Sequence, residues 1–243
     1  MKPKIGIIIQ ARIRSTRLPA KVMLDLAGRP LIYRIVERLK RCKLVDEIIV
    51  AVPEKEESNI IKDAISELNV SVFEGSEDDV FDRYTRCAIA HNLDYVVRFP
   101  ADNPMPGWDV IDELISWHLE NNPNGFSSNL SSVFSNGMVD GIGGEMISGS
   151  ILVKENSKKL SAEKREHPHL NFYNYALKKS TNEQVQVGSP PVSDWYKRPN
   201  YLFDINSLEE YLFVSPIFSF LKILKHRSAD KSYIAGAKSA PAI

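Results

Sequence analysis

Residues 10–21 concentrate groups that bind anions. The segment reads Q-A-R-I-R-S-T-R-L-P-A-K and carries four cationic side chains and two hydroxyls: Arg12, Arg14, Arg17, Lys21, Ser15 and Thr16. A loop that leaves the carboxyl end of a strand brings such groups and backbone N–H groups to one point, as a polyphosphate requires. The spacing is neither G-x-x-x-x-G-K-S/T nor G-x-G-x-x-G. The segment predicts a polyphosphate-binding loop, and a solvated basic loop is the alternative.

Two aspartates stand where the chain leaves predicted strands. Asp102 lies in A-D-N-P and Asp204 in F-D-I-N. If both strands end at one edge of a sheet, the carboxylates converge and suit magnesium, which takes its other ligands from water and substrate phosphates. An aspartate at such a junction also commonly caps the helix that follows. Both interpretations stay open on the sequence alone.

The first half of the chain contains the elements that position these groups. Strand patterns alternate with helical patterns, the strands at 4–9, 47–52, 70–73 and 95–99 and the helices at 31–41, 59–68, 78–91 and 108–119. Such alternation requires right-handed crossovers and a largely parallel sheet covered on both faces. We therefore expect an α/β fold, a three-layer Rossmann-like sandwich, with ligands at the carboxyl ends of the strands.

The pattern changes after residue 120, where Asn, Ser and Gly become frequent. The elements expected beyond it are helices at 150–160 and 169–178, strands at 145–147, 185–187 and 201–204, and a last helix from Ser207. We expect a single domain over residues 1–243, in which residues 121–200 form an arm. Residues 228–243 show no periodicity, which predicts a weakly ordered tail.

Charge is distributed unevenly along the chain. The 31 basic and 31 acidic residues cancel over the 243 residues, yet residues 1–50 carry 12 basic and 4 acidic groups, a net charge of +8. This asymmetry favours an anionic partner for the first segment, and a basic surface helix explains part of it. No nucleic-acid-binding motif accompanies the charge, so a nucleic acid is not the expected partner.

The cysteine content and the length of the apolar runs indicate in which cellular compartment the protein works. Cys42 and Cys87 are too few and too far apart for a disulfide framework, and neither lies in a C-x-x-C motif. The apolar run at 5–9 is too short for a membrane span or a signal-peptide core. We expect a cytoplasmic protein without a membrane partner.

Six segments, in order, carry a family resemblance. They are I-I-Q-A-R-x-x-S-T-R-L-P-x-K-V from residue 8, G-S-E-D-D-V-F-D-R-Y at 75–84, V-V-R-F-P-A-D-N-P at 96–104, D-G-x-x-x-E at 140–145, R-E-H at 165–167 and F-D-I-N-S-L-E-E at 203–210. Together they resemble the cytidylyltransferases that make CMP-activated acidic sugars, most closely the SpsF-like spore-coat branch. Synthetases of CMP-Kdo and CMP-acylneuraminate carry variants of the first segment. The resemblance covers roughly residues 4–215.

The resemblance implies a reaction in which CTP and a sugar acid give a CMP-sugar and pyrophosphate, with Mg2+ as cofactor. It implies that Arg12 and Arg17 hold the β- and γ-phosphates and that Lys21 stabilises charge on the triphosphate, with Asp102 as the fourth catalytic residue. Asp102 and Asp204 would bind the metal. The wider nucleotide site would include Gln10, the Ala11 N–H group, the turn of Ser15 and Thr16, and Ser76, Asp78 and Arg83. A homodimer is expected by analogy.

The acceptor side is less sharply defined. The resemblance assigns to it Glu145, Arg165, Glu166 and His167, although R-E-H alone also suits a charged surface turn, and the glycines before Glu145 also suit a sharp turn. The chain has Arg14 and Ala20 where the family usually has glycine, and Gly143 where relatives have an acidic residue. Two other functions stay open: a cytidylyltransferase for a phosphonate or phosphorylated acceptor, and a nucleotide-binding homologue without turnover.

Overall fold

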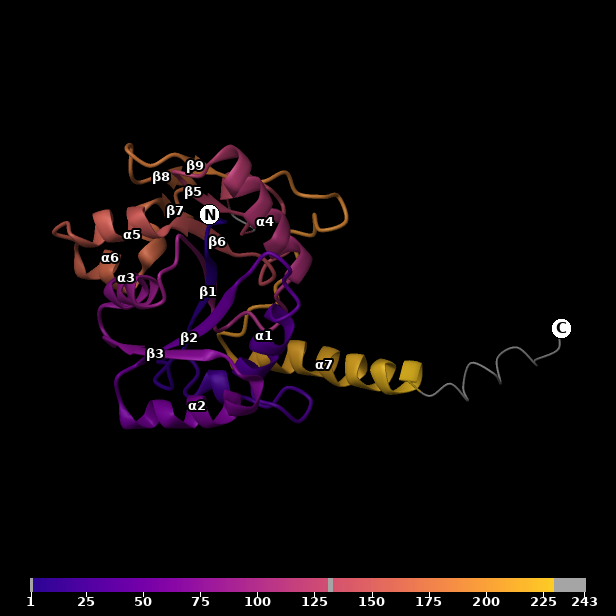
Figure 1. Cartoon of the computed structure of the whole chain (residues 1–243). Coiled ribbons are helices and arrows are strands. Elements are labelled where there is room, and N and C mark those ends of the chain that lie inside the picture. The colour runs from indigo at the N-terminus through magenta and orange to yellow at the C-terminus, as the bar shows by residue number, and fades with distance from the viewer. Residues whose placement is uncertain (1, 131–132, 230–243) are drawn as a thin grey trace.

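A mixed, mostly parallel sheet with helices on both faces organises residues 2–130 and 133–229, which the computed structural model describes (Figure 1). The strand order is β3-β2-β1-β4-β6-β5-β9. The strands are β1 (Ile5–Gln10), β2 (Glu47–Pro53), β3 (Ser71–Gly75), β4 (Tyr95–Pro100), β5 (Phe126–Ser128), β6 (Glu145–Ser148) and β9 (Val187–Gly188). β1, β2, β3 and β4 run parallel, whereas β6 is antiparallel to β4 and β5.

The helices divide between the two faces as a three-layer sandwich requires. They are α1 (Leu31–Leu39), α2 (Asn59–Ile65), α3 (Val80–Ala90), α4 (Trp108–Asn121), α5 (Gly149–Asn156), α6 (Ala162–Glu166) and α7 (Leu208–Ala229). Ile7 and Ile9 of β1 pack in one core with α1, α2 and α4, whereas Ile8 packs in a second core with α3 and α5. Alternation along a buried strand produces both cores. The predicted α/β sandwich is confirmed.

Short elements complete the fold. Five 3-10 turns are η1 (Lys21–Met23), η2 (Glu56–Ser58), η3 (Ser66–Leu68), η4 (Val133–Ser135) and η5 (Pro168–Asn171), and a second, two-stranded sheet pairs β7 (Tyr173–Asn174) with β8 (Lys179–Ser180). No helix in the described ranges has the length and apolar content that a membrane span needs.

Two of the expected elements in the second half are wrong. Residues 169–178 form η5 and β7 instead of a helix, because Tyr173 and Tyr175 lie two residues apart with their rings 5.1 Å from each other and pack against the α3 side of the sheet. Residues 201–204 are not a strand, since only Leu202 forms a bridge, to Asp140. The short strand β5 was not predicted.

The last helix begins where the sequence predicts. Ser207 Oγ accepts a hydrogen bond from the Glu210 N–H group at 3.2 Å, and Glu210 Oε2 accepts one from the Ser207 N–H group at 2.8 Å. This reciprocal capping box fixes the start of α7. The helix extends away from the rest of the chain in Figure 1. Most of the predicted tail, residues 230–243, lies outside the described residues.

Candidate functional site

Lys21 connects segments that are distant in sequence. Its Nζ donates to Asp102 Oδ2 at 2.9 Å and to Asn206 Oδ1 at 3.0 Å, and its side chain is 15% exposed. Lys21 follows the loop that leaves β1, and Asp102 follows β4, the neighbour of β1 in the sheet. Because parallel neighbours end at the same edge, the fold brings the cation and the carboxylate together.

Asp204 joins the same cluster through Asn206. The Asn206 Nδ2 donates to Asp204 Oδ2 at 2.6 Å, and the Ile205 N–H group donates to the Asp102 carbonyl at 2.8 Å. The segment before α7 is therefore tied to the turn after β4. As the sequence leads one to expect, Lys21 and both aspartates lie at one edge of the sheet.

Neither aspartate caps the helix that follows it. Gly107 stands at the N-cap of α4 without a side-chain cap, and Ser207 and Glu210 cap α7. The capping interpretation is therefore wrong for Asp102 and Asp204. Their carboxylates instead accept hydrogen bonds from Lys21 and Asn206.

Negative charge accumulates around Asp204. Burial raises the pKa of its carboxyl group, and repulsion from Asp140, Glu210 and Asp102 raises it further. Asp140 approaches closely because Gly141 has a φ of 86°, and a Cβ there would lie 3.0 Å from the Asp204 nitrogen. An added cation lowers the electrostatic energy of such a group of carboxylates.

These residues fit magnesium that is bound partly by a substrate. Within residues 2–130 and 133–229, no group of three or more His, Cys, Asp or Glu side chains is arranged to hold a metal ion. Asp102 and Asp204 offer a pair of hard oxygen ligands, and magnesium typically completes its octahedron with water and substrate phosphates. The donor set suits a metal that enters with a phosphate substrate.

The cations of the loop after β1 have different partners. Arg14 Nε lies 2.9 Å from Glu57 Oε1, and Arg12 Nη2 lies 3.6 Å from Glu166 Oε1. Arg17 is exposed, as is Thr16, and forms no ion pair with the described part of the chain. Arg14 is thus paired with a residue of η2, whereas Arg17 is accessible to a ligand. Arg12 would give up only a long ion pair to bind a phosphate.

Backbone geometry changes two expectations for this loop. The Ala11 N–H group donates to the Ala51 carbonyl at 3.1 Å, which contradicts its expected contact with phosphate, because the pairing of β1 with β2 continues past Gln10. Ala20 adopts φ 52° and ψ 28°, a left-handed conformation that explains the family's glycine at this position. Ser15 Oγ shapes the turn by accepting the Leu18 N–H group at 3.5 Å.

Arg83 is a fully buried cation beside this loop. Its Nη1 donates to the Ser76 carbonyl at 2.5 Å, while its Nε and Nη2 are buried and have no partner among the described residues. Burial lowers its pKa, and the charge of Arg12 lowers it further. Unpaired buried donors are unfavourable by about 1–3 kcal/mol, and the 0% exposure of Arg83 keeps these two donors away from a ligand at the surface. Asp78 is exposed at the same turn.

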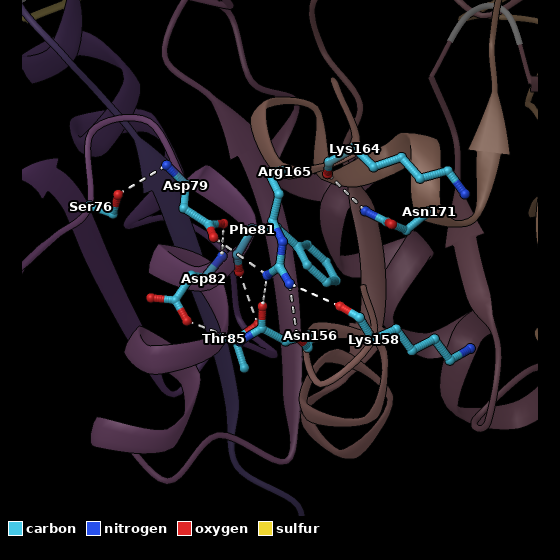
Figure 2. Close-up of polar contacts among 10 residues, drawn as sticks. All are labelled: Ser76, Asp79, Phe81, Asp82, Thr85, Asn156, Lys158, Lys164, Arg165 and Asn171. Atoms are coloured by element: carbon cyan, nitrogen blue, oxygen red, sulfur yellow. Dashed lines mark hydrogen bonds and ion pairs between the residues drawn. The ribbon is translucent and has the colours of Figure 1, made fainter. Parts of the chain in front are cut away.

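Arg165 holds the R-E-H segment against α3 and α5. Its Nη2 donates to the carbonyls of Asn156 at 3.1 Å and Lys158 at 3.0 Å, its Nη1 donates to Asn156 Oδ1, and Nη1 lies 3.5 Å from Asp79 Oδ2 (Figure 2). Asp79 in turn caps α3 by accepting the Asp82 N–H group at 2.8 Å. The side chain of Arg165 is thus engaged within the fold, and the next residue, Glu166, faces Arg12.

Glu145 lies beneath the surface, in a polar network. Arg98 Nη1 and Tyr175 Oη each lie 2.5 Å from one of its carboxylate oxygens, and Tyr175 Oη also lies 3.0 Å from Ser128 Oγ. Arg98 lowers the pKa of the Glu145 carboxyl group against the effect of burial, which keeps the group ionised. Glu145 is 1% exposed, so its carboxylate is committed to this buried network. His167 is exposed in the turn after α6.

The missing acidic side chain at Gly143 has a steric explanation. A Cβ at this position would lie 2.6 Å from Asn129 Oδ1, and the same oxygen accepts the Gly144 N–H group at 2.9 Å. Asn129 therefore occupies the space that a side chain on residue 143 would need.

Sequence reasoning did not single out four residues of these clusters. The resemblance could have pointed to three of them, because the six segments quoted above contain Arg98, Asp140 and Asn206. Tyr175 lies outside these segments. Their roles depend on contacts across long sequence separations, such as the 185 residues between Lys21 and Asn206.

Known proteins resemble this chain over most of its length. The family model described as cytidylyltransferase matches residues 6–186. The spore coat polysaccharide biosynthesis protein SpsF of Bacillus subtilis is 27% identical over 216 residues, which cover 87% of this chain and 85% of SpsF. A solved cytidylyltransferase structure from Leptospira borgpetersenii has a TM-score of 0.79 and 25% identity, and covers 100% of both chains.

A more distant structure shares the fold. The CMP-2-keto-3-deoxy-manno-octonic acid synthetase complexed with CTP has a TM-score of 0.64 at 15% identity, and covers 89% of this chain and 98% of its own. Because the family model spans most of the sequence and the fold agrees with it, this chain belongs to the cytidylyltransferase family of CTP-dependent enzymes.

Proposed function

We propose that the protein transfers CMP from CTP to a hydroxyl group of an acidic sugar of the Kdo or nonulosonate type, and releases pyrophosphate. The observation that carries the proposal is the Lys21 ammonium, 2.9 Å from Asp102 and linked through Asn206 to Asp204, beside a loop of cations. A cation that suits a triphosphate, next to carboxylate oxygens that suit Mg2+, supports the proposal. The similarity to SpsF supports a role in surface polysaccharide or glycan synthesis.

The triphosphate would lie along the loop after β1. Arg12 and Arg17 would bind the β- and γ-phosphates, with the turn of Ser15 and Thr16 beside them, and Lys21 would neutralise charge on the leaving group. The acceptor oxygen forms a bond to the α-phosphorus, the bond from that phosphorus to the bridging oxygen breaks, and the hydroxyl proton is released. In such transfers, positioning and charge neutralisation supply most of the rate.

Asp102 and Asp204 would hold Mg2+ beside Lys21. The ion would neutralise charge on the phosphate oxygens. Lys21 and Asn206 orient the two carboxylates, because each makes a hydrogen bond to one of them.

Arg83 would act as a positioning residue for the nucleoside site, because it is 0% exposed and its Nη1 holds the Ser76 carbonyl. Ser76, Asp78 and Gln10, at the ends of neighbouring elements, would lie near cytosine and ribose.

The acceptor would lie near Glu166 and His167. Both are exposed, and Glu166 faces the Arg12 guanidinium. Arg165 and Glu145 would act as positioning residues, because their side chains are committed to contacts within the fold.

We also propose a homodimer, working in the cytoplasm. Leu208, Leu212, Phe213 and Phe220 of α7 are each more than half exposed, at 56–60%, which supports contact with a second copy. Burial raises the pKa of both cysteine thiols to about 12, and neither forms a disulfide, in keeping with a reducing compartment. Light scattering after size-exclusion chromatography measures the mass: a monomer at micromolar concentration contradicts the dimer.

Pyrophosphate release tests the proposed reaction. The assay contains CTP, Mg2+ and one acceptor at a time: Kdo, a nonulosonate, or a phosphonate. Release with a sugar acid, and at least tenfold less with UTP or ATP, is the expected result. Release only with the phosphonate identifies the other acceptor class, and CTP binding in a thermal-shift assay without release from any acceptor identifies a nucleotide-binding homologue.

A further inference from the structure

A cavity lies beside the segments that carry Asp140 and Asp204. Its volume is about 430 Å³, within the usual range for small-molecule sites. Trp108, Val139, Tyr196 and Phe203 contribute to a largely apolar wall. No part of the proposed reaction uses this cavity.

The cavity is separate from the proposed nucleotide site. Val139 and Phe203 line it, and each directly precedes a carboxylate of the charged cluster, Asp140 and Asp204, which do not line it. Successive side chains of extended backbone point to opposite sides. The same two segments therefore present aspartates to one space and apolar side chains to the other.

Cations outnumber anions at the cavity. Arg38 and Arg198 line it together with one carboxylate, Asp109, whose Oδ2 already accepts a hydrogen bond from Tyr196 Oη at 2.5 Å. Arg198 Nη1 donates to backbone carbonyls at 3.0 Å and 2.7 Å, and its charge also acts on the Asp194 carboxylate, which lies outside the cavity lining.

Arg38 is a partly buried cation that forms no direct ion pair in the described part of the chain, although Asp109 and Glu37 act on its charge from further away. Its Nε donates to the Pro106 carbonyl at 3.2 Å, and its guanidinium lies over the Trp108 ring, 5.2 Å from the centroid. Burial lowers its pKa and the neighbouring Arg41 lowers it further, which together outweigh the opposite effect of Asp109 and Glu37. An anion bound beside it would relieve both effects.

We infer that this cavity binds a small molecule that combines a flat aromatic ring system with one anionic group, independently of CTP. The rings would pack against Trp108, Tyr196 and Phe203, and the anion would pair with Arg38 and Arg198. Aromatic and aliphatic walls supply the affinity at such sites, while a few charged groups fix the orientation.

Two fluorescent probes of matched shape test the inference. 8-Anilinonaphthalene-1-sulfonate has the aromatic rings and an anion, whereas N-phenyl-1-naphthylamine has the same rings without the sulfonate. In fluorescence titrations of the full chain, Arg38→Met should weaken binding of the sulfonate probe about tenfold, which is about 1.4 kcal/mol, and change binding of the neutral probe less than twofold. An unchanged affinity for the sulfonate probe, or an equal loss for both probes, overturns the inference.

Arg29 provides the matched control. Its guanidinium also lies over an aromatic ring, 4.7 Å from the Tyr33 centroid, but it does not line the cavity. Arg29→Met should leave both affinities within twofold of the parent. If Arg29→Met weakens binding of the sulfonate probe as much as Arg38→Met does, the effect comes from surface charge in general, and the inference is overturned.

Filling the cavity gives a second, independent test. Val139→Phe should weaken the binding of both probes at least fivefold while far-UV circular dichroism stays native. This variant remains informative if Arg38→Met does not fold.

Competition with the nucleotide gives a third test. Saturating CTP with Mg2+ should change the affinity of the sulfonate probe less than twofold in the parent protein. Full displacement by CTP shows that the probe binds at the nucleotide site and overturns the inference. Failure of pyrophosphate release does not affect these titrations.

Discussion

The Lys21 Nζ lies 2.9 Å from Asp102 Oδ2, although 81 residues separate them in the chain. The pair is mostly shielded from water, with side-chain exposures of 15% and 25%. Partial burial strengthens the interaction between the two charges. Because both residues are at the sheet edge where β1 and β4 end, this contact connects the cationic loop to the carboxylates that we propose as metal ligands.

Lys21→Met should lower kcat by about 10²–10³-fold, since removing one group that stabilises transition-state charge has effects of this size. Pyrophosphate release with CTP, Mg2+ and the best acceptor measures it. Lys159→Met removes an exposed lysine far along the chain and should retain the parental rate. Lys21→Met with a rate within twofold of the parent contradicts the role of Lys21.

Asp204→Asn should stabilise the protein at pH 7 without metal. The pKa of this carboxyl group is raised in the folded state, so the folded protein binds more protons than the unfolded chain and loses stability as pH rises above about 4. The variant lacks this loss, and its advantage in melting temperature should vanish below about pH 4.

The same variant tests the metal. Magnesium with CTP should raise the melting temperature of the parent, and Asp204→Asn should lose most of that increase. Asp63→Asn, an exposed aspartate on α2, should show neither effect. An equal magnesium-dependent increase in parent and Asp204→Asn argues against Asp204 as a ligand.

Ala20→Gly should stabilise the fold by about 0.5–1 kcal/mol. The left-handed conformation of Ala20 is unfavourable by roughly 1–2 kcal/mol for an L-residue, and glycine avoids this while losing more backbone entropy. Urea unfolding measures the change. Ala64→Gly in α2 should instead destabilise by about 1 kcal/mol. Destabilisation by both substitutions is incompatible with strain at Ala20.

Glu145→Gln should destabilise the fold by about 3 kcal/mol, because it leaves the Arg98 charge in a buried position without its ionised partner. Urea unfolding at pH 7 measures the free energy. Glu120→Gln, on the exposed side of α4, should change it by less than about 0.5 kcal/mol. If Glu145→Gln is as stable as the parent but has a raised KM for the acceptor, then Glu145 contacts the acceptor directly.

The sequence by itself determined the alternation of strands and helices in the first half of the chain and the cationic loop after β1. Hydrophobic periodicity and local composition report these features because they depend on neighbours along the chain. The sequence was less informative between residues 121 and 204, where short elements such as β5 and β7 form only through packing against the sheet.

Tertiary structure decided which groups meet. It placed Asp204 beside Asp102, engaged the Ala11 N–H group with Ala51, and committed Arg165 and Glu145 to contacts within the fold. Residue types and local spacing are the same whether a carboxylate caps a helix, pairs with a buried arginine or faces a cleft. Only the path of the backbone between distant segments, fixed by the order of strands in the sheet, distinguishes these roles.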